Sequence, residues 1–335
     1  MGRFLGRRRK PRVYVTRKLP GEGIERLRAQ CEVSVWDEDG PPPRERLIDE
    51  VREAEGLLCL LTDNVDAGLL DAAPRLRIVS TMAVGYDHID VDAATARGVL
   101  VANTPGVLTE TTADMAFALL LAAARRLPEA ERAVREGRWT AWSPLFLAGA
   151  DVHGATLGIV GLGAIGRAVA RRARGFDMRV LYTSRTPKPE LEQELGVQYV
   201  SFEDLLAQSD FVTVHVPLTP ETRHMFDDQA FARMKPTAVF VNTARGAIVD
   251  ETALLRALGS HAIACAAIDV TETEPLPKHD PLLRLPNLLV TPHIASASVA
   301  TRTRMADLAV ENLLAGLAGK LPAHCVNPDA LERRR

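Results

Sequence analysis

The stretch ATLGIVGLGAIGRAVARRARGF, residues 155–176, contains the pattern from which the fold is predicted. An apolar run is followed at once by Gly161, Gly163 and Gly166, and then by a segment with helical periodicity. The pattern GxGxxG is weak evidence alone, but this strand–turn–helix setting is the one in which it binds a dinucleotide. The first two glycines allow a tight turn and the close approach of a pyrophosphate, and the third allows helix and strand to pack closely. We therefore expect a dinucleotide-binding βα unit rather than a purely structural glycine turn.

Apolar runs of strand length continue on both sides of this stretch. Downstream they are RVLYTS (179–184), FVTVHV (211–216), AVFVNT (238–243), CAAIDV (265–270) and LLVTP (288–292). Upstream they are RVYVT (12–16), VSVW (33–36), GLLCLL (56–61), RIVSTM (77–82) and VLVANT (99–104). Most are separated by segments with helical periodicity. Continuous apolar strands alternating with helices predict parallel sheets covered on both faces.

Two long helical patterns suggest how the domains are connected. One, residues 109–137, is expected to be capped by Thr109 and kinked at Pro128, and the other covers residues 297–317. The second pattern has no strand after it, so an inserted second domain is the simplest arrangement. We expect an α/β protein with two doubly wound parallel sheets and a cleft between them. The domains would be a flavodoxin-like substrate domain (11–105 and 298–330) and a Rossmann domain (106–297), with helices 109–126 and 297–317 crossing between them.

Composition excludes several classes of partner. Forty-one Lys and Arg residues nearly balance 43 Asp and Glu, and the net charge of −2 offers no broad surface for nucleic acid or an anionic membrane. No run approaches the roughly 18 apolar residues of a membrane span. Residues 1–10 are basic without an acid, which suits a targeting segment, a nucleic-acid arm or, as we expect, a solvated disordered tail.

The cysteines and histidines show no metal-binding spacing. No CxxC pair occurs among the four cysteines and no HxxxH cluster among the eight histidines, so we expect no metal site. The cysteines instead fit small buried side chains in a reducing compartment, which predicts a cytoplasmic location. They are Cys31, Cys59, Cys265 and Cys325.

The second strand of the dinucleotide-binding unit bears on the choice of cofactor. An NAD enzyme has an acid near the end of this strand that binds the adenosine ribose, but Tyr182 and Thr183 are followed by Ser184, Arg185 and Thr186. A carboxylate would repel a 2′-phosphate, whereas hydroxyls and a guanidinium would bind it. NADP(H) is therefore expected in preference to NAD(H), which stays possible. The alternative is that Arg185 is an ordinary solvated arginine.

Three residues near the ends of later strands could carry chemistry. Arg245 follows AVFVNT, Glu274 follows CAAIDV, and His293 follows the run LLV. Singly they could be a surface arginine, a solvated carboxylate and a helix-capping histidine. Together, at the carboxyl ends of parallel strands, they supply a cation, an acid and a titratable base.

These segments resemble the D-isomer-specific 2-hydroxyacid dehydrogenase family over nearly the whole chain. The motifs are VGYDHIDV (84–91), NTPGVLTETTAD (103–114), GLGAIG (161–166), HVPLTPET (215–222), NTARG (242–246), DVTETEP (269–275) and TPHIASA (291–297). Within the family, three segments resemble the glyoxylate/hydroxypyruvate reductases: WTAWSPLFLAG (139–149), LYTSR (181–185) and EPLPKHDPLL (274–283). The resemblance implies NADPH-dependent reduction of glyoxylate to glycolate and of hydroxypyruvate to D-glycerate.

The resemblance also implies roles for residues. Arg245, with the backbone of Val84 and Gly85, would hold the 2-oxo acid. His293 would be the general acid, oriented by Glu274. Asp269 would face the nicotinamide amide. The cofactor would be lined by Thr112, Gly161, Leu162, Gly163, Ala164, Ile165, Gly166, Ser184, Arg185, Thr186, His215, Val216, Pro217, Thr222, Thr243, Ala244, Arg245, Asp269, His293 and Ala295.

Two departures and two alternatives accompany this assignment. Ser184 replaces the acid of NAD-preferring relatives, and Ala295 replaces a glycine found in many members of the family. Another D-2-hydroxyacid dehydrogenase, acting on phosphoglycerate or on 2-oxo acids broadly, is one alternative. A nucleotide-sensing, corepressor-like binding protein is the other.

The segment 139–147 is too apolar for a simple connector. Its large side chains either cover the core of their own subunit or form a homodimer contact, and the residues alone favour neither. The resemblance favours a homodimer in which Trp142 enters the partner's substrate pocket. The side chains are Trp139, Trp142, Leu145, Phe146 and Leu147.

Overall fold

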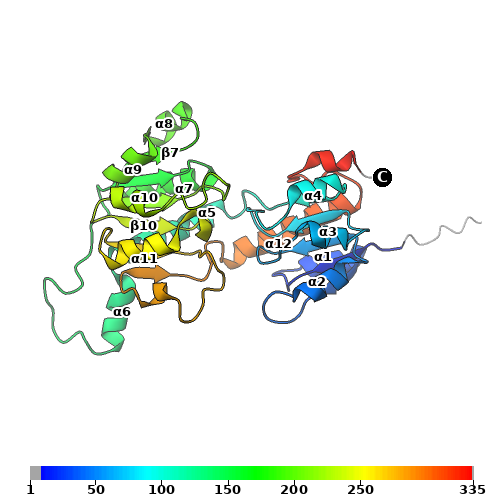
Figure 1. The fold of residues 1–335 in the computed structure, drawn as a ribbon, viewed down its shortest axis with the longest axis horizontal. Coiled ribbons are helices and arrows are strands. Elements are labelled where there is room, and N and C mark those ends of the chain that lie inside the picture. The colour runs from blue at the N-terminus through cyan, green and yellow to red at the C-terminus, as the bar shows by residue number, and fades with distance from the viewer. Residues whose placement is uncertain (1–8, 334–335) are drawn as a thin grey trace, which may run out of the picture. The chain divides into compact units, whose positions relative to one another are not determined.

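The computed structural model describes residues 9–333, and these divide into two compact units (Figure 1). The second unit runs from Thr109 to Ala297, and the first consists of the described residues on either side of it. Both long helices therefore start at a division between the units and lie within one unit each, instead of spanning the two. The basic tail predicted for residues 1–10 falls almost entirely outside the described residues.

The first unit contains a five-stranded parallel sheet with the order β2-β1-β3-β4-β5, which is the flavodoxin-like order. Its strands are β1 (Arg12–Val15), β2 (Glu32–Val35), β3 (Gly56–Cys59), β4 (Ile78–Thr81) and β5 (Leu100–Ala102). Its helices are α1 (Gly23–Gln30), α2 (Arg44–Val51), α3 (Ala67–Asp71), α4 (Val91–Ala96) and α12 (Val299–Leu317).

Alternate residues along each strand of this sheet face opposite layers. Val13 and Val15 pack with Leu27 of α1 and Leu313 of α12 in one core. Tyr14, between them, lies in the other core with buried side chains of α2, α3 and α4. The last helix thus completes the first unit by covering one face of its sheet.

The second unit contains a seven-stranded parallel sheet with the order β12-β11-β10-β9-β6-β7-β8. The strand order reverses between β6 and β9, which is the switch point where such sheets bind dinucleotides. The strands are β6 (Thr156–Val160), β7 (Arg179–Thr183), β8 (Val197–Tyr199), β9 (Phe211–Val214), β10 (Val239–Asn242), β11 (Cys265–Ile268) and β12 (Leu288–Val290). The predicted class, two doubly wound parallel-sheet α/β folds, is confirmed.

One strand of this sheet was missing from the sequence prediction. The edge strand β8 has only three residues, with exposed Gln198 between Val197 and half-buried Tyr199. A strand paired on one side needs no continuous apolar run, so this segment lacked the pattern by which the other six were recognised.

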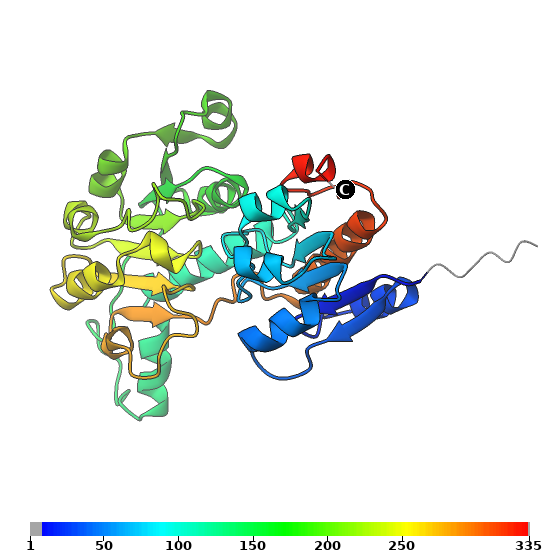
Figure 2. The same ribbon diagram turned by 45° about the vertical axis from the view of Figure 1, so that its right-hand side comes forward.

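The helix expected over residues 109–137 is two helices. The seven helices of the unit are α5 (Thr109–Ala124), α6 (Leu127–Arg135), α7 (Ala164–Ala173), α8 (Pro189–Leu195), α9 (Phe202–Gln208), α10 (Asp228–Arg233) and α11 (Glu251–Gly259). Between α5 and α6, Arg126 adopts a left-handed conformation with φ 52°, and Pro128 lies in the first turn of α6. Proline cannot continue a helix without losing a hydrogen bond and clashing with an earlier carbonyl, so the chain breaks instead of bending. α6 and the segment after it extend away from the rest of the unit (Figures 1 and 2).

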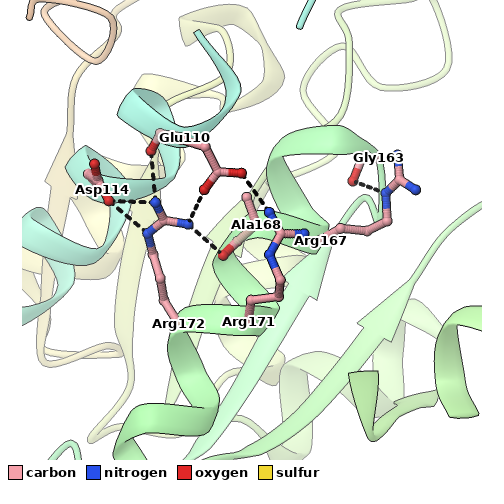
Figure 3. A network of polar contacts seen from close by, with 7 residues as sticks. All are labelled: Glu110, Asp114, Gly163, Arg167, Ala168, Arg171 and Arg172. Carbon is pink, nitrogen blue, oxygen red and sulfur yellow. Dashed lines mark hydrogen bonds and ion pairs between the residues drawn. The ribbon is translucent and has the colours of Figure 1, made fainter. Parts of the chain in front are cut away.

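Helices α5 and α7 pack on the same face of the sheet and are joined by charged side chains (Figure 3). The guanidinium of Arg172 on α7 bonds Asp114 at 2.6 and 2.8 Å and Glu110 at 2.9 Å, both on α5. Arg171 donates to the other oxygen of Glu110 at 2.6 Å. This network joins the surfaces of α5 and α7, the helix that follows the glycine loop, and the apolar faces of the two helices pack in one core.

Two kinds of feature are absent from residues 9–333. In the part of the chain that the structure describes, no helix is long and apolar enough to cross a membrane. Nor do any three His, Cys, Asp or Glu side chains of the described residues lie together in a way that could hold a metal ion.

Candidate active site

The glycine loop after β6 has the geometry that the sequence predicts. Gly161 has φ +100°, and a Cβ there would lie 2.6 Å from the carbonyl oxygen of His215. A Cβ on Gly166 would lie 2.1 Å from the carbonyl oxygen of Gly161. Only a glycine at this position therefore lets α7 approach the loop so closely. Gly163 has open space where a side chain would be, at the start of α7. The loop thus leaves bare backbone and a helix N-terminus facing open space.

The segment after β7 carries the residues predicted to select the cofactor. Ser184 donates its hydroxyl to the carbonyl of Thr186 at 2.7 Å, and Arg185 and Thr186 are exposed. Lys188, which no sequence motif singles out, follows two residues later. The ammonium of Lys188 donates to the carbonyl of Leu162, inside the glycine loop, at 2.8 Å. This contact joins residues 26 positions apart, so no local sequence pattern indicates it.

The segment after β9 contributes polar groups to the same edge of the sheet. The ring of half-buried His215 lies 2.9 Å from the hydroxyl of Thr213, and burial lowers the pKa of His215 to about 3. This imidazole is therefore neutral at physiological pH. Thr222 donates to the carbonyl of Pro217 at 2.7 Å, which closes the turn after the strand.

Arg245 follows β10 in a loop held by backbone and side-chain contacts. Asn242 donates its amide to the Arg245 carbonyl at 2.9 Å and accepts the N–H of Ala244 at 3.0 Å. A Cβ on Gly246 would lie 1.9 Å from the backbone of Thr271, so the loop packs directly against the segment after β11. The half-buried guanidinium of Arg245 bonds the Ala244 carbonyl at 2.8 Å.

Glu274 and His293 form a hydrogen-bonded pair. Nδ1 of His293 lies 2.7 Å from Oε2 of Glu274, and both side chains are mostly buried, 23% and 27% exposed. The other carboxylate oxygen accepts the N–H of Thr271 at 3.1 Å. Burial alone would raise the pKa of Glu274, but the His293 bond and charge, the Thr271 bond and the nearby charge of Arg245 together lower it. The three predicted catalytic residues are therefore brought to one edge of one sheet.

Asp269 has a structural part in this arrangement that its sequence position did not reveal. Its carboxylate is 1% exposed and accepts hydrogen bonds from the hydroxyl of Thr291 at 2.5 Å and from the N–H groups of Ile294 at 2.9 Å and Ala295 at 2.7 Å. Its carbonyl accepts the N–H of His293 at 2.8 Å. His293 has φ 52°, a conformation that non-glycine residues adopt only where the surroundings enforce it. Asp269 supplies that enforcement.

The remaining predicted site residues are spread over other elements. Val84 and Gly85 follow β4 in the first unit, where the Val84 carbonyl accepts the side-chain amide of Asn103 at 2.7 Å. Thr112 is buried in α5. Trp142 is 82% exposed in the segment after α6, so it does not cover the core of its own unit.

Comparison with known proteins places the chain in a family. Residues 117–295 match the model described as D-isomer specific 2-hydroxyacid dehydrogenase, NAD binding domain. A glyoxylate reductase from Korarchaeum cryptofilum is 53% identical over 326 residues, which covers 97% of this chain and 98% of the relative. The chain belongs to the D-isomer-specific 2-hydroxyacid dehydrogenase family.

Solved structures agree with this assignment. A protein from Thermus thermophilus aligns with a TM-score of 0.89 and 48% identity, over 94% of this chain and 99% of that one. An NADPH-dependent glyoxylate/hydroxypyruvate reductase from Sinorhizobium meliloti, in complex with NADP and malonate, aligns with a TM-score of 0.84 and 37% identity, over 97% and 99%. The protein is thus an NAD(P)-dependent D-2-hydroxyacid dehydrogenase that acts on a small molecule.

The described residues fit a nicotinamide dinucleotide. Gly163 leaves space at the start of α7 where a phosphate could approach the backbone. The Thr243 hydroxyl is buried without a hydrogen-bond partner in the structure, as expected of a group whose partner is a ligand. Both positions were predicted to contact the cofactor.

Proposed function

We propose that this protein reduces glyoxylate to glycolate and hydroxypyruvate to D-glycerate with NADPH. The observation that carries the proposal is the His293–Glu274 pair, which lies at the carboxyl edge of the dinucleotide-binding sheet with Arg245 close enough for its charge to act on Glu274. The substrate class is supported by the relatives, several of which are named glyoxylate reductase at about half sequence identity.

In the proposed reaction a bound nicotinamide supplies the hydride, and the chain supplies the proton and the binding groups. Nδ1 of His293 is engaged by Glu274, so Nε2 is the atom that would donate a proton to the carbonyl oxygen. Glu274 stays ionised because its pKa is lowered, and it can therefore stabilise the imidazolium and hold the ring in place. Arg245 would bind the substrate carboxylate with its planar guanidinium. Val84 and Gly85 stay predicted as further binding groups.

The preference for NADPH rests on the segment after β7. Ser184, Arg185 and Thr186 offer hydroxyls and a cation, with no carboxylate among them to repel a 2′-phosphate. NADH would bind the same loop with fewer charge-assisted contacts. A cytoplasmic location and the absence of a nucleic-acid partner stay predictions.

We further propose a homodimer that uses α6 and the segment after it. Trp139 and Trp142 are 60% and 82% exposed and Leu145 is 83% exposed, an apolar surface of the kind that marks a protein contact. In a dimer, Trp142 would close the partner's substrate pocket and restrict it to short 2-oxo acids. Trp142→Ala should then lower kcat/KM for hydroxypyruvate about tenfold and admit bulkier substrates, with NADPH affinity unchanged. A protein that is monomeric by light scattering and fully active at the same concentration would contradict this.

The function is tested by measuring NADPH and NADH oxidation with a series of 2-oxo acids. Glyoxylate and hydroxypyruvate should give the highest kcat/KM, with NADPH preferred. Higher kcat/KM for 3-phosphohydroxypyruvate or for bulky 2-oxo acids would instead identify another dehydrogenase of the family. Cofactor binding without turnover of any substrate would identify a nucleotide-sensing protein.

A further inference from the structure

Lys188 is a cation that lies against the glycine loop. Its ammonium donates to the carbonyl of Leu162 at 2.8 Å, which uses one of its three donors. The position of its backbone is also fixed, because the Lys188 N–H donates to the hydroxyl of Tyr182 at 2.7 Å. The Tyr182 side chain is buried in β7, and its hydroxyl donates in turn to Glu192 of α8 at 2.8 Å. Hydrogen bonds therefore hold both the backbone and the ammonium of Lys188 in position.

Lys188 and Arg185 differ in how far they are exposed to solvent. Lys188 is half-buried, and among the described residues no carboxylate lies within ion-pair distance of its ammonium. Arg185 is exposed. Arg185 therefore faces solvent, whereas the Lys188 ammonium lies at the loop that would bind phosphate.

We propose that Lys188 is a specificity-determining residue that binds the 2′-phosphate of NADPH together with Arg185 and Ser184. This inference rests on the proposed use of NADPH and names a second cation, beside Arg185, that would contribute to it. The segment after β7 is where the adenosine ribose binds in this fold, and Lys188 connects that segment to the glycine loop. Its two remaining N–H donors can bond phosphate oxygens while the Leu162 contact holds the side chain in position.

The test compares two probes that differ only in the 2′-phosphate: adenosine 2′,5′-bisphosphate and adenosine 5′-monophosphate. Affinities of the full-length protein for both are measured by calorimetry, alongside thermal melting. Lys188→Met should weaken the bisphosphate about ten- to a hundred-fold and leave the monophosphate within about twofold. Lys188→Arg keeps a cation and should retain most of the affinity. Lys320→Met, an equal loss of charge in the first unit, serves as the matched control and should change neither.

Each other outcome has a defined meaning. If Lys188→Met weakens both probes equally, the lysine binds the 5′-phosphate or shapes the glycine loop, and the inference is wrong. If it weakens neither while the wild type prefers the bisphosphate, the inference is also wrong, because NADPH use stands but another residue carries it. If the wild type does not prefer the bisphosphate, the protein does not recognise a 2′-phosphate, and the proposed preference for NADPH is wrong.

Discussion

Strands near the two ends of the second sheet present the proposed functional residues in different ways. At β11 and β12, the carboxylate of Asp269 is nearly inaccessible and makes three hydrogen bonds to the turn that carries His293, whose ring is held by Glu274. At β7, Arg185 and Thr186 are exposed. The comparison indicates that the groups proposed to take part in the reaction are fixed by hydrogen bonds to a buried carboxylate. Arg185 and Thr186, which are proposed to select the cofactor with Lys188, lie where substitution costs the fold little.

The largest expected effect comes from the fixed end. His293→Asn removes the proposed general acid while keeping a side chain of similar polarity, and should lower kcat by about two to four decades. NADPH affinity, measured by fluorescence titration, should be nearly unchanged because the glycine loop is untouched. An Asn variant with wild-type turnover would show that the proton comes from another group.

Arg245→Ala should damage binding and rate together. Without the guanidinium, the substrate carboxylate has lost its charged partner, so KM should rise and kcat should fall, and we expect kcat/KM to drop by about two to three decades. Steady-state kinetics with glyoxylate separates the two parameters. A rise in KM alone, with kcat intact, would mean that Arg245 only binds the substrate and does not help to orient it.

At the exposed end, substitution should change the preference between NADPH and NADH and not the rate of the reaction. Arg185→Ala should reduce the preference for NADPH over NADH by about tenfold or more, since it removes charge-assisted hydrogen bonds to the 2′-phosphate. The melting temperature should stay close to that of the wild type because the side chain is exposed. The ratio of kcat/KM for the two cofactors measures the effect, and an unchanged ratio would remove Arg185 from the selection.

The smallest effect concerns stability and pH. The pKa of Glu274 is lowered in the folded protein, so its ionised form contributes stability that is complete above the unfolded value of about 4.3 and is lost as the pH falls through the folded value. Glu274→Gln cannot lose this contribution on acidification. Its unfolding midpoint in urea should lie below that of the wild type at pH 7, and the gap should narrow below about pH 4. A gap independent of pH would show that the charge of Glu274 adds nothing.

Much of the fold could be predicted because most of its strands and helices have a local sequence pattern. Eleven strands lie in apolar runs, and the spacing of the glycines in residues 161–166 indicates the tight loop between β6 and α7. The strand β8 could not be found in this way because an edge strand of three residues has no such run. The break between α5 and α6 was expected only as a kink, since proline marks the place but not the size of the interruption.

The arrangement of the candidate site was predictable to the extent that its residues follow strand ends. Arg245, Glu274 and His293 each come after a strand, and the structure brings them to one edge. The parts of the site that depend on contacts between distant residues were not predictable. The bonds of Asp269 reach across more than twenty positions to a turn, and Lys188 meets the glycine loop only because β6 and β7 are neighbours.

We therefore propose that the reaction and the choice of cofactor depend on strands near opposite ends of one sheet. The most direct test is kcat/KM for glyoxylate reduction, measured with NADPH and with NADH, for the wild type, His293→Asn and Arg185→Ala. His293→Asn should lower both values by the same large factor and leave their ratio unchanged, whereas Arg185→Ala should lower the NADPH value alone. A changed ratio in the histidine variant, or an equal loss with both cofactors in the arginine variant, would contradict the separation.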